Sequence, residues 1–181
     1  MIFEPLSIAG SWLIRLEPIE DDRGLFARAF DERAFRERGL ALPAVQVNLS
    51  VSRRRGTIRG LHWQVEPYGE AKFLRCTRGA VYDVAVDLRA DSPSCRQWQG
   101  VRLSADDRAA VYVPAGCAHG YQALEDGAEV LYGVSQPYVP GAERGLRWDD
   151  PALRIEWPIR DGVIVSDKDA AWPTLDEVPV T

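Results

Sequence analysis

Two histidines, His62 and His119, are the side chains of this sequence best suited to transferring protons. Imidazole changes its charge near physiological pH, so it can take a proton in one step and return it in another. His62 lies in the run RGLHWQ (59–64) and His119 in the run PAGCAHG (114–120), and the glycines in both runs indicate strand edges. Taken singly, each histidine is expected to be a hydrogen-bonded structural residue, so a catalytic role has to be argued from its neighbours.

Lys72 and Lys168 are the next candidates, because every other basic residue of the chain is an arginine. Arginine keeps its proton, whereas lysine is a compact ammonium whose pKa responds to its surroundings. Two lysines in an arginine-rich chain are therefore candidates for stabilising negative charge in a reaction. Chance retention is the alternative for either lysine taken alone.

The PxGxxH motif over residues 114–119 is similar to the second motif of the cupins, small β-barrel proteins in which this histidine often binds a metal. The first cupin motif normally supplies His-x-His, but the second of those positions is Gln64 here. The three cysteines lie far apart, without the close pairing of a zinc or redox site. Because a transition metal generally needs three or more protein ligands, we expect no metal and no cofactor.

The composition narrows the class of partner. A net charge of −5 and a pI of about 5.1 disfavour nucleic-acid binding, so an anionic ligand would need a local basic pocket. The first residues lack the features of a signal peptide and no apolar run reaches membrane-spanning length, so we expect a cytoplasmic protein with reduced cysteines and no membrane contact. The 181 residues predict one domain, with a Pro-containing tail after Asp169 that is expected to be loosely ordered.

Short alternating runs of apolar and polar residues predict the strands that must position these side chains. In the clearest run, Ala80–Leu88, every second residue from Tyr82 is apolar, and Asp83 and Asp87 face the other way. Further strands are expected at Trp12–Leu16, Val45–Val51, Trp98–Leu103, Ala110–Val113 and Val130–Val134. Many short strands separated by turn residues predict an all-β fold, a cupin-type antiparallel jelly-roll sandwich or barrel.

One short peripheral helix is expected from Asp31 to Arg38. Asp31 can cap its first turn, Phe30 can pack onto Phe35, and Gly39 can end it.

Several motifs, taken in order, resemble the signature blocks of the dTDP-4-dehydrorhamnose 3,5-epimerase family. The blocks are Asp22-Arg23-Gly24-x-Phe26, Gln46-x-Asn48-x-Ser50, Gly56-x-x-Arg59-Gly60-Leu61-His62-x-Gln64, Lys72-x-x-Arg75, Asp83-Val84-x-Val86-Asp87-Leu88-Arg89, Pro114-x-Gly116-x-Ala118-His119-Gly120, Leu131-Tyr132 and Ser166-x-Lys168-Asp169. Each block is weak evidence alone, but the ordered set runs from about Ile8 to Pro173 and is specific.

The resemblance implies inversion of carbons next to the ketone of a nucleotide-linked 4-keto-6-deoxy sugar. Such a reaction needs a base, a group that stabilises the enolate and an acid on the opposite face. By resemblance the base is His62, paired with Asp169. Lys72 would stabilise the enolate, and Tyr132 would be the acid. The structural alternatives are a solvated acidic turn for Asp169, an exposed strand position for Lys72 and an ordinary core position for Tyr132.

The same resemblance implies a nucleotide-sugar site and a partner subunit. Its substrate-binding residues are expected to be Arg23, Phe26, Arg28, Gln46, Asn48, Arg59, His119 and Lys168. A guanidinium suits a diphosphate, and the neutral amides suit a ribose or base edge. In the family, the segment that contains Arg23 and Phe26 reaches the neighbouring subunit's site, which implies a homodimer with exchanged N-terminal strands.

One position departs from the family pattern. The family has a glutamate where this chain has Arg28, and an arginine would donate to acceptors such as those of cytosine, whereas an acid accepts from thymine. The expected nucleotide is dTDP, with CDP as the alternative. Enzymes that invert only C3 or only C5 share these motifs, so the carbon stays open. The other readings are a sugar-nucleotide 3,4-ketoisomerase, a binding cupin without turnover and a metal-dependent cupin enzyme.

Overall fold

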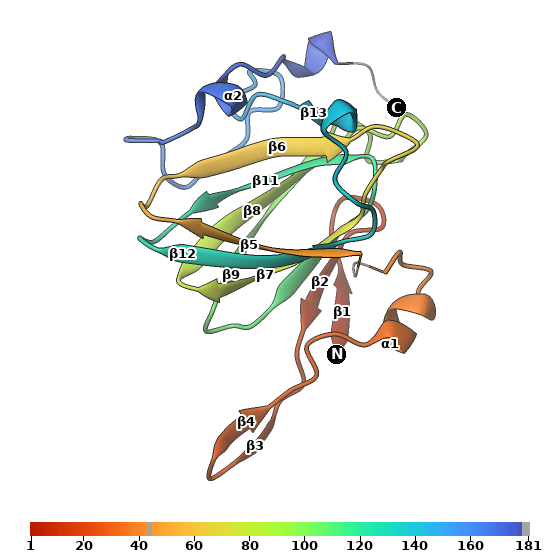
Figure 1. Ribbon diagram of the computed structural model, residues 1–181, viewed down its shortest axis with the longest axis vertical. Helices are drawn as coiled ribbons and strands as arrows, with labels where there is room; N and C mark the ends of the chain where they lie inside the picture. The colour runs from red at the N-terminus through yellow and green to blue at the C-terminus, as the bar shows by residue number, and fades with distance from the viewer. Residues whose placement is uncertain (43–44, 179–181) are drawn as a thin grey trace.

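The protein folds into two facing antiparallel sheets and a projecting hairpin, and the computed structural model describes residues 1–42 and 45–178 (Figure 1). The larger sheet has the strand order β1-β2-β10-β7-β12-β5 and contains β1 (Ile2–Pro5), β2 (Trp12–Arg15), β5 (Gln46–Ser52), β7 (Lys72–Arg78), β10 (Ala110–Val113) and β12 (Ala128–Val134). The smaller sheet has the order β13-β6-β11-β8-β9 and contains β6 (Ile58–Gln64), β8 (Ala80–Asp87), β9 (Trp98–Ser104), β11 (Cys117–Ala123) and β13 (Glu143–Gly145). The expected all-β jelly roll is confirmed.

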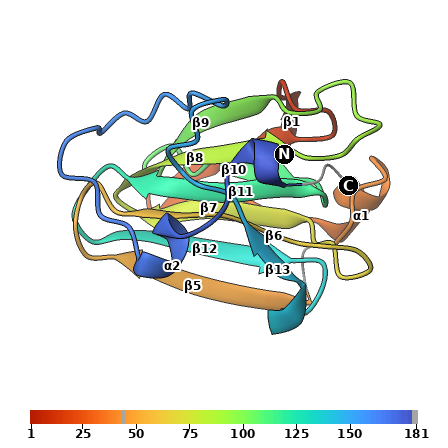
Figure 2. The same cartoon turned by 90° about the horizontal axis from the view of Figure 1, so that it is seen from above.

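Strand β8 explains how the smaller sheet is held on both faces. Val81 and Ala85 pack into the core between the sheets, and Val84 and Val86 pack into a second core outside. The outer core is covered by the C-terminal segment, drawn in blue in Figures 1 and 2. The alternation predicted for this strand is therefore confirmed, but both of its faces are buried, and Asp83 and Asp87 are buried with them.

Two adjacent inner strands of the smaller sheet carry the histidines. His62 lies inside β6 and His119 inside β11, and the two residues are direct partners in the antiparallel register. The strands come unusually close at Gly60, where a Cβ atom would lie 2.6 Å from the Cα of Gly120. Gly60 also has φ +122°, which other residues rarely adopt, so glycine is required there for both space and backbone conformation.

The expected peripheral helix is present and shorter than predicted. Helix α1 spans Glu32–Arg36, and the Asp31 carboxylate caps it by accepting from the amide of Ala34 at 3.2 Å. The ring centroids of Phe30 and Phe35 are 4.9 Å apart, so Phe30 packs onto Phe35 as expected from the sequence.

The C-terminal segment packs on the outer side of the smaller sheet. Leu175 and Val178 are buried in the outer core, and residues 179–181 lie outside the described part. Its short elements are α2 (Asp167–Ala170) and the 3₁₀ turn η2 (Leu175–Glu177), with another such turn, η1 (Pro140–Ala142), before β13. Apolar residues spaced through the tail anchor it, although they form no regular pattern.

An N-terminal hairpin projects from the sandwich (Figure 1). It consists of β3 (Ile19–Asp21) and β4 (Gly24–Phe26), which pair only with each other. Ile19 is 70% and Phe26 69% exposed. Within residues 1–42 and 45–178, no helix has the length and apolar character needed to cross a membrane.

Candidate active site

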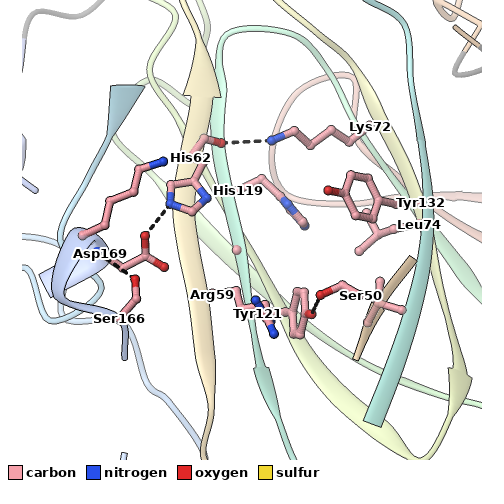
Figure 3. A pocket seen from close by; sticks show the side chains of 13 residues that line it. Ser50, Arg59, His62, Lys72, Leu74, His119, Tyr121, Tyr132, Ser166 and Asp169 are labelled. Atoms are coloured by element: carbon pink, nitrogen blue, oxygen red, sulfur yellow. Dashed lines mark hydrogen bonds and ion pairs between the residues drawn. The ribbon is translucent and has the colours of Figure 1, made fainter. Parts of the chain in front are cut away.

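A polar cavity of about 330 Å³ opens between the two sheets (Figure 3). His62, Arg59 and His119 reach it from the smaller sheet, and Lys72 and Tyr132 from the larger sheet. Further lining residues are Ser50, Leu74, Gly120, Tyr121, Val130, Ser166, Lys168 and Asp169. The cavity therefore gathers all four side chains expected to do chemistry.

His62 and Asp169 form a hydrogen-bonded pair although 107 residues separate them. His62 Nε2 lies 2.7 Å from Asp169 Oδ1, and the other carboxylate oxygen accepts from the amide of Gly60 at 3.1 Å. Asp169 reaches this place because Ser166 caps α2, its hydroxyl accepting from the Asp169 amide. The carboxylate favours a proton on Nε2, which leaves the lone pair on Nδ1.

Asp169 is held as an anion. Burial by itself would raise the pKa of Asp169, but the hydrogen bonds from His62 and Gly60 and the charge of His62 keep it below the ordinary value. A permanent carboxylate stabilises the imidazolium that forms when His62 takes a proton.

Lys72 is fixed by a buried network at the start of β7. Its ammonium donates to the carbonyl of His62 at 3.1 Å and lies 3.2 Å from Glu70 Oε1. Glu70 in turn accepts from Gln64 Nε2 at 2.9 Å, and the side-chain oxygen of Gln64, Oε1, accepts from the backbone amide of Val139. Gln64, at a position where cupins normally have a metal-binding histidine, therefore positions Glu70 and Lys72.

Tyr132 lies on β12 of the larger sheet, across the cavity from His62 (Figure 3). Burial raises the pKa of Tyr132 above its ordinary value, so the phenol is neutral at pH 7 and can donate its proton. The hydroxyl of Tyr132 and the imidazole of His62 can therefore address opposite faces of one ligand.

His119 forms a second histidine–carboxylate pair next to the first. Its Nε2 lies 2.7 Å from Asp83 Oδ2, and Asp83 is 2% exposed. Asp83 was expected only as part of a motif, and the structure adds it to the candidate site as the partner of His119.

Arg59, Gln46 and Asn48, expected to bind the diphosphate and the nucleoside, line two cavities that share residues. Arg59 donates to the carbonyl of Val51 and the hydroxyl of Ser52, and within the described residues it forms no ion pair with an acid. Gln46 and Asn48 line an adjoining cavity of about 320 Å³ that shares His62 and other residues with the first. Together these cavities offer a guanidinium and neutral amides beside the histidines, which suits a ligand with a charged part and a sugar-sized part.

Lys168 belongs to a cluster that the sequence analysis did not find. Its ammonium lies 2.7 Å from Glu143 Oε2, which also accepts from the Tyr138 hydroxyl at 2.8 Å. Burial by itself would raise the pKa of Glu143, but these two hydrogen bonds lower it. Tyr138 and Glu143 both line the adjoining cavity. Neither residue lies in a distinctive local pattern, and the contact that joins them to Lys168 is long-range.

Three expected binding residues lie away from this cavity in the single chain. Arg23 and Phe26 are on the projecting hairpin, and Arg28 follows it. Arg23 pairs with Asp21, and Arg28 with Asp31. Among residues 1–42 and 45–178 no group of three or more His, Cys, Asp or Glu side chains is arranged to hold a metal ion.

Comparison with known proteins gives one consistent family. The family model described as dTDP-4-dehydrorhamnose 3,5-epimerase matches residues 5–177. The enzyme of that name from Sinorhizobium fredii is 45% identical over 181 residues, which cover 100% of this chain and 93% of that protein.

Solved structures agree. The crystal structure of dTDP-4-dehydrorhamnose 3,5-epimerase from Elizabethkingia anophelis superposes with a TM-score of 0.94 at 35% identity, covering 97% of both chains. The dTDP-6-deoxy-D-glucose-3,5-epimerase of Legionella pneumophila, in complex with dTDP-4-keto-L-rhamnose, superposes with a TM-score of 0.91 at 34% identity, covering 98% of this chain and 94% of that one.

Proposed function

This chain belongs to the dTDP-4-dehydrorhamnose 3,5-epimerase family, and we propose that it converts dTDP-4-dehydro-6-deoxy-D-glucose to dTDP-4-dehydro-L-rhamnose by inverting C3 and C5. The observation that carries the proposal is the cavity between the sheets. A base paired with a carboxylate, His62 with Asp169, faces a neutral phenol, Tyr132, from the opposite sheet. This is the arrangement that an inversion through an enolate needs.

The reaction starts at a carbon next to the ketone. His62 Nδ1 takes the proton and becomes an imidazolium, the C–H electron pair forms a C=C bond, and the carbonyl π pair moves onto oxygen. Lys72 stabilises this oxygen as a compact positive charge. Asp169 stabilises the imidazolium.

Inversion is completed from the other side of the ring. Tyr132 donates its phenolic proton to the carbon, where the C=C electron pair forms the new C–H bond, and a lone pair of the enolate oxygen re-forms the carbonyl. The phenolate regains a proton and the imidazolium loses one to solvent, so the overall reaction is an isomerisation. The raised pKa of Tyr132 keeps the donor protonated between turnovers.

The remaining cavity residues are proposed to bind the substrate. The guanidinium of Arg59, which forms no ion pair within the described residues, suits the diphosphate, and Lys168, Gln46 and Asn48 suit the nucleotide. His119 lies beside His62 in the register and is proposed to orient the sugar.

The projecting hairpin supports a homodimer in which each subunit completes its partner's site. Arg23 and Phe26 cannot serve their own cavity in this arrangement, and Phe26 and Ile19 expose large apolar side chains. Such surfaces are normally covered by a partner.

Mixing two inactive variants tests the exchange. In a heterodimer of Arg23→Ala and His62→Ala subunits, one site combines an intact cavity with an intact hairpin. Random mixing should therefore restore about a quarter of the wild-type activity. A mixture with no restored activity would rule out the exchange.

The function itself is tested by proton NMR of the dTDP-4-keto sugar in heavy water. We expect the C3 and C5 proton signals both to disappear, because each carbon is deprotonated by His62 and reprotonated with solvent deuterium. Loss at only one carbon would make the protein a mono-epimerase. If neither signal is lost, the experiment is repeated with the CDP-linked sugar. Absence of exchange with both sugars would contradict the proposal.

Arg28 makes the nucleotide a separate question. Titration calorimetry with dTDP and CDP decides it: we expect tighter binding of dTDP, and a clear preference for CDP would replace the dTDP assignment.

A further inference from the structure

Trp172, in the C-terminal segment, lies against His62, the proposed catalytic base. Its indole meets the His62 imidazole edge to face, with ring centroids 6.1 Å apart and planes at 71°. Trp172 follows Asp169 by three residues, so one short stretch of chain supplies both the carboxylate and the aromatic ring that contact His62. The Lys168 ammonium lies 5.6 Å from the indole on another side.

Gly145 makes room for this indole. It is the direct partner of His62 between strands β13 and β6. A Cβ atom on Gly145 would lie 2.1 Å from two ring carbons of Trp172, so the indole occupies the space that a side chain would take. The backbone φ of Gly145 lies outside the positive range, and close approach is therefore the reason for glycine at this position.

The backbone around Trp172 is held on its C-terminal side. The amide of Arg147 donates to the carbonyl of Pro173 at 3.0 Å, and the amide of Leu175 donates to Asp150 Oδ2 at 2.6 Å. The Leu175 side chain is buried in the outer core. The backbone that follows Trp172 is thus anchored by the packed tail, and the indole lies directly against the Gly145 backbone.

We propose that Trp172 is a positioning residue for the His62–Asp169 pair. Its ring, supported by Gly145, limits rotation of the imidazole and keeps water from that side of the Nε2–carboxylate hydrogen bond. The proton then stays on Nε2, and the Nδ1 lone pair stays directed for proton abstraction. The catalytic consequence rests on the proposed function, but the effect on the imidazole does not depend on turnover.

The first test measures the imidazole without substrate. Long-range proton–nitrogen NMR of the unliganded protein reports which ring nitrogen of His62 carries the proton. We expect one tautomer, protonated on Nε2, in the wild type and a mixture of tautomers in Trp172→Ala. Gly145→Ala should give the same mixture, because its methyl group displaces the indole. Trp172→Phe should keep the single tautomer, since a phenyl ring still fills the space beside His62.

The second test separates turnover from binding. Trp172→Ala should lower kcat for exchange about tenfold and change KM less than twofold, because the indole packs directly on the His62 imidazole, whereas its contact with the substrate-binding Lys168 is a cation–π contact at 5.6 Å and Lys168 keeps its ion pair with Glu143. Trp172→Phe should recover most of kcat. The matched control is Trp98→Ala, which removes a half-buried indole on β9 outside the cavity lining and should leave kcat and the His62 tautomer unchanged.

A single Nε2 tautomer in both Trp172→Ala and Gly145→Ala would overturn the proposal. If Trp172→Ala does not fold, Gly145→Ala and Trp172→Phe decide: a mixed tautomer in the first and a single one in the second supports positioning, and identical spectra refute it. Absence of turnover with any nucleotide sugar would defeat the proposed function and leave the tautomer result standing.

Discussion

The two histidines of this chain each lie 2.7 Å from a carboxylate, but the two pairs are assembled in different ways. His119 and Asp83 lie on neighbouring strands of one sheet, where the backbone register holds them together. His62 lies in the sheet, and Asp169 is brought to it by the C-terminal segment. The His119 side chain is 11% exposed and the His62 side chain 28%.

This difference suits the two pairs to different tasks. A pair inside a sheet has little freedom and is shielded, so it can orient a ligand group. The more exposed imidazole of His62, backed by a separately packed carboxylate and close to Lys72, can reach a ligand and change its charge. The comparison therefore supports the proposal that His62 abstracts the proton and that His119 orients the sugar.

Replacing each histidine tests this division most directly. His62→Ala should lower the rate of C–H exchange at least about 1,000-fold, since it removes the base, and should leave calorimetric binding of dTDP within about threefold. His119→Ala should lower exchange only about tenfold. Equal losses from the two substitutions would remove the distinction between the pairs.

The carboxylate paired with His62 should matter more for the exchange rate than the carboxylate paired with His119. Asp169→Asn should lower exchange about 100-fold or more, because an amide can donate to Nε2 and so moves the imidazole proton to Nδ1. Asp83→Asn should lower it less than about tenfold. Exchange rates in heavy water measure both effects, and thermal unfolding of each variant serves as the control for folding. A larger loss from Asp83→Asn would reverse the assignment.

Tyr132→Phe tests whether the acid comes from the larger sheet or from the second histidine pair. Without the phenol, abstraction by His62 should continue within about tenfold, whereas formation of inverted product should fall about 100-fold. Proton NMR separates the two quantities, because a sugar that exchanges its C–H proton for deuterium and keeps its configuration reports abstraction alone. Normal inversion would instead make His119 the candidate acid.

Asp87 provides a stability comparison on the same strand as Asp83. Burial by itself would raise the pKa of Asp87, but hydrogen bonds from Arg89, Ser92 and Ser94 lower this pKa to about 2. A carboxyl with a lowered folded-state pKa stabilises the fold above its unfolded pKa, and this contribution is lost as the pH falls toward 2.

The shift corresponds to at most about 2 kcal/mol of unfolding free energy at pH 7. Asp87→Asn should lower stability at pH 7 by about that amount and reduce the fall in stability between pH 5 and pH 2, with kcat unchanged. Urea unfolding at several pH values measures this. Loss of exchange in a folded Asp87→Asn variant would show that Asp87 serves the cavity as well as the scaffold.

Three strands that the alternation did not predict carry site residues. The runs at Ala80–Leu88, Ala110–Val113 and Val130–Val134 correspond to β8, β10 and β12, where apolar residues fill most positions, although β8 also carries Asp83 and β12 also carries Tyr132. Strands β6, β7 and β11 show no simple alternation, since their inward positions carry His62, Lys72 and His119. Residues retained for chemistry interrupt the periodicity from which a strand is predicted.

The sequence by itself determined the all-β class, the capped helix at Asp31 and the candidate residues His62, Lys72, Tyr132 and Asp169, because residue type, local spacing and ordered motifs carry that information. Only the tertiary structure decided which of these residues meet. The contacts of Asp169 with His62, of Asp83 with His119 and of Trp172 with Gly145 join segments far apart in the chain. Such contacts depend on strand order, register and the packing of a tail without periodicity, and no local pattern encodes these.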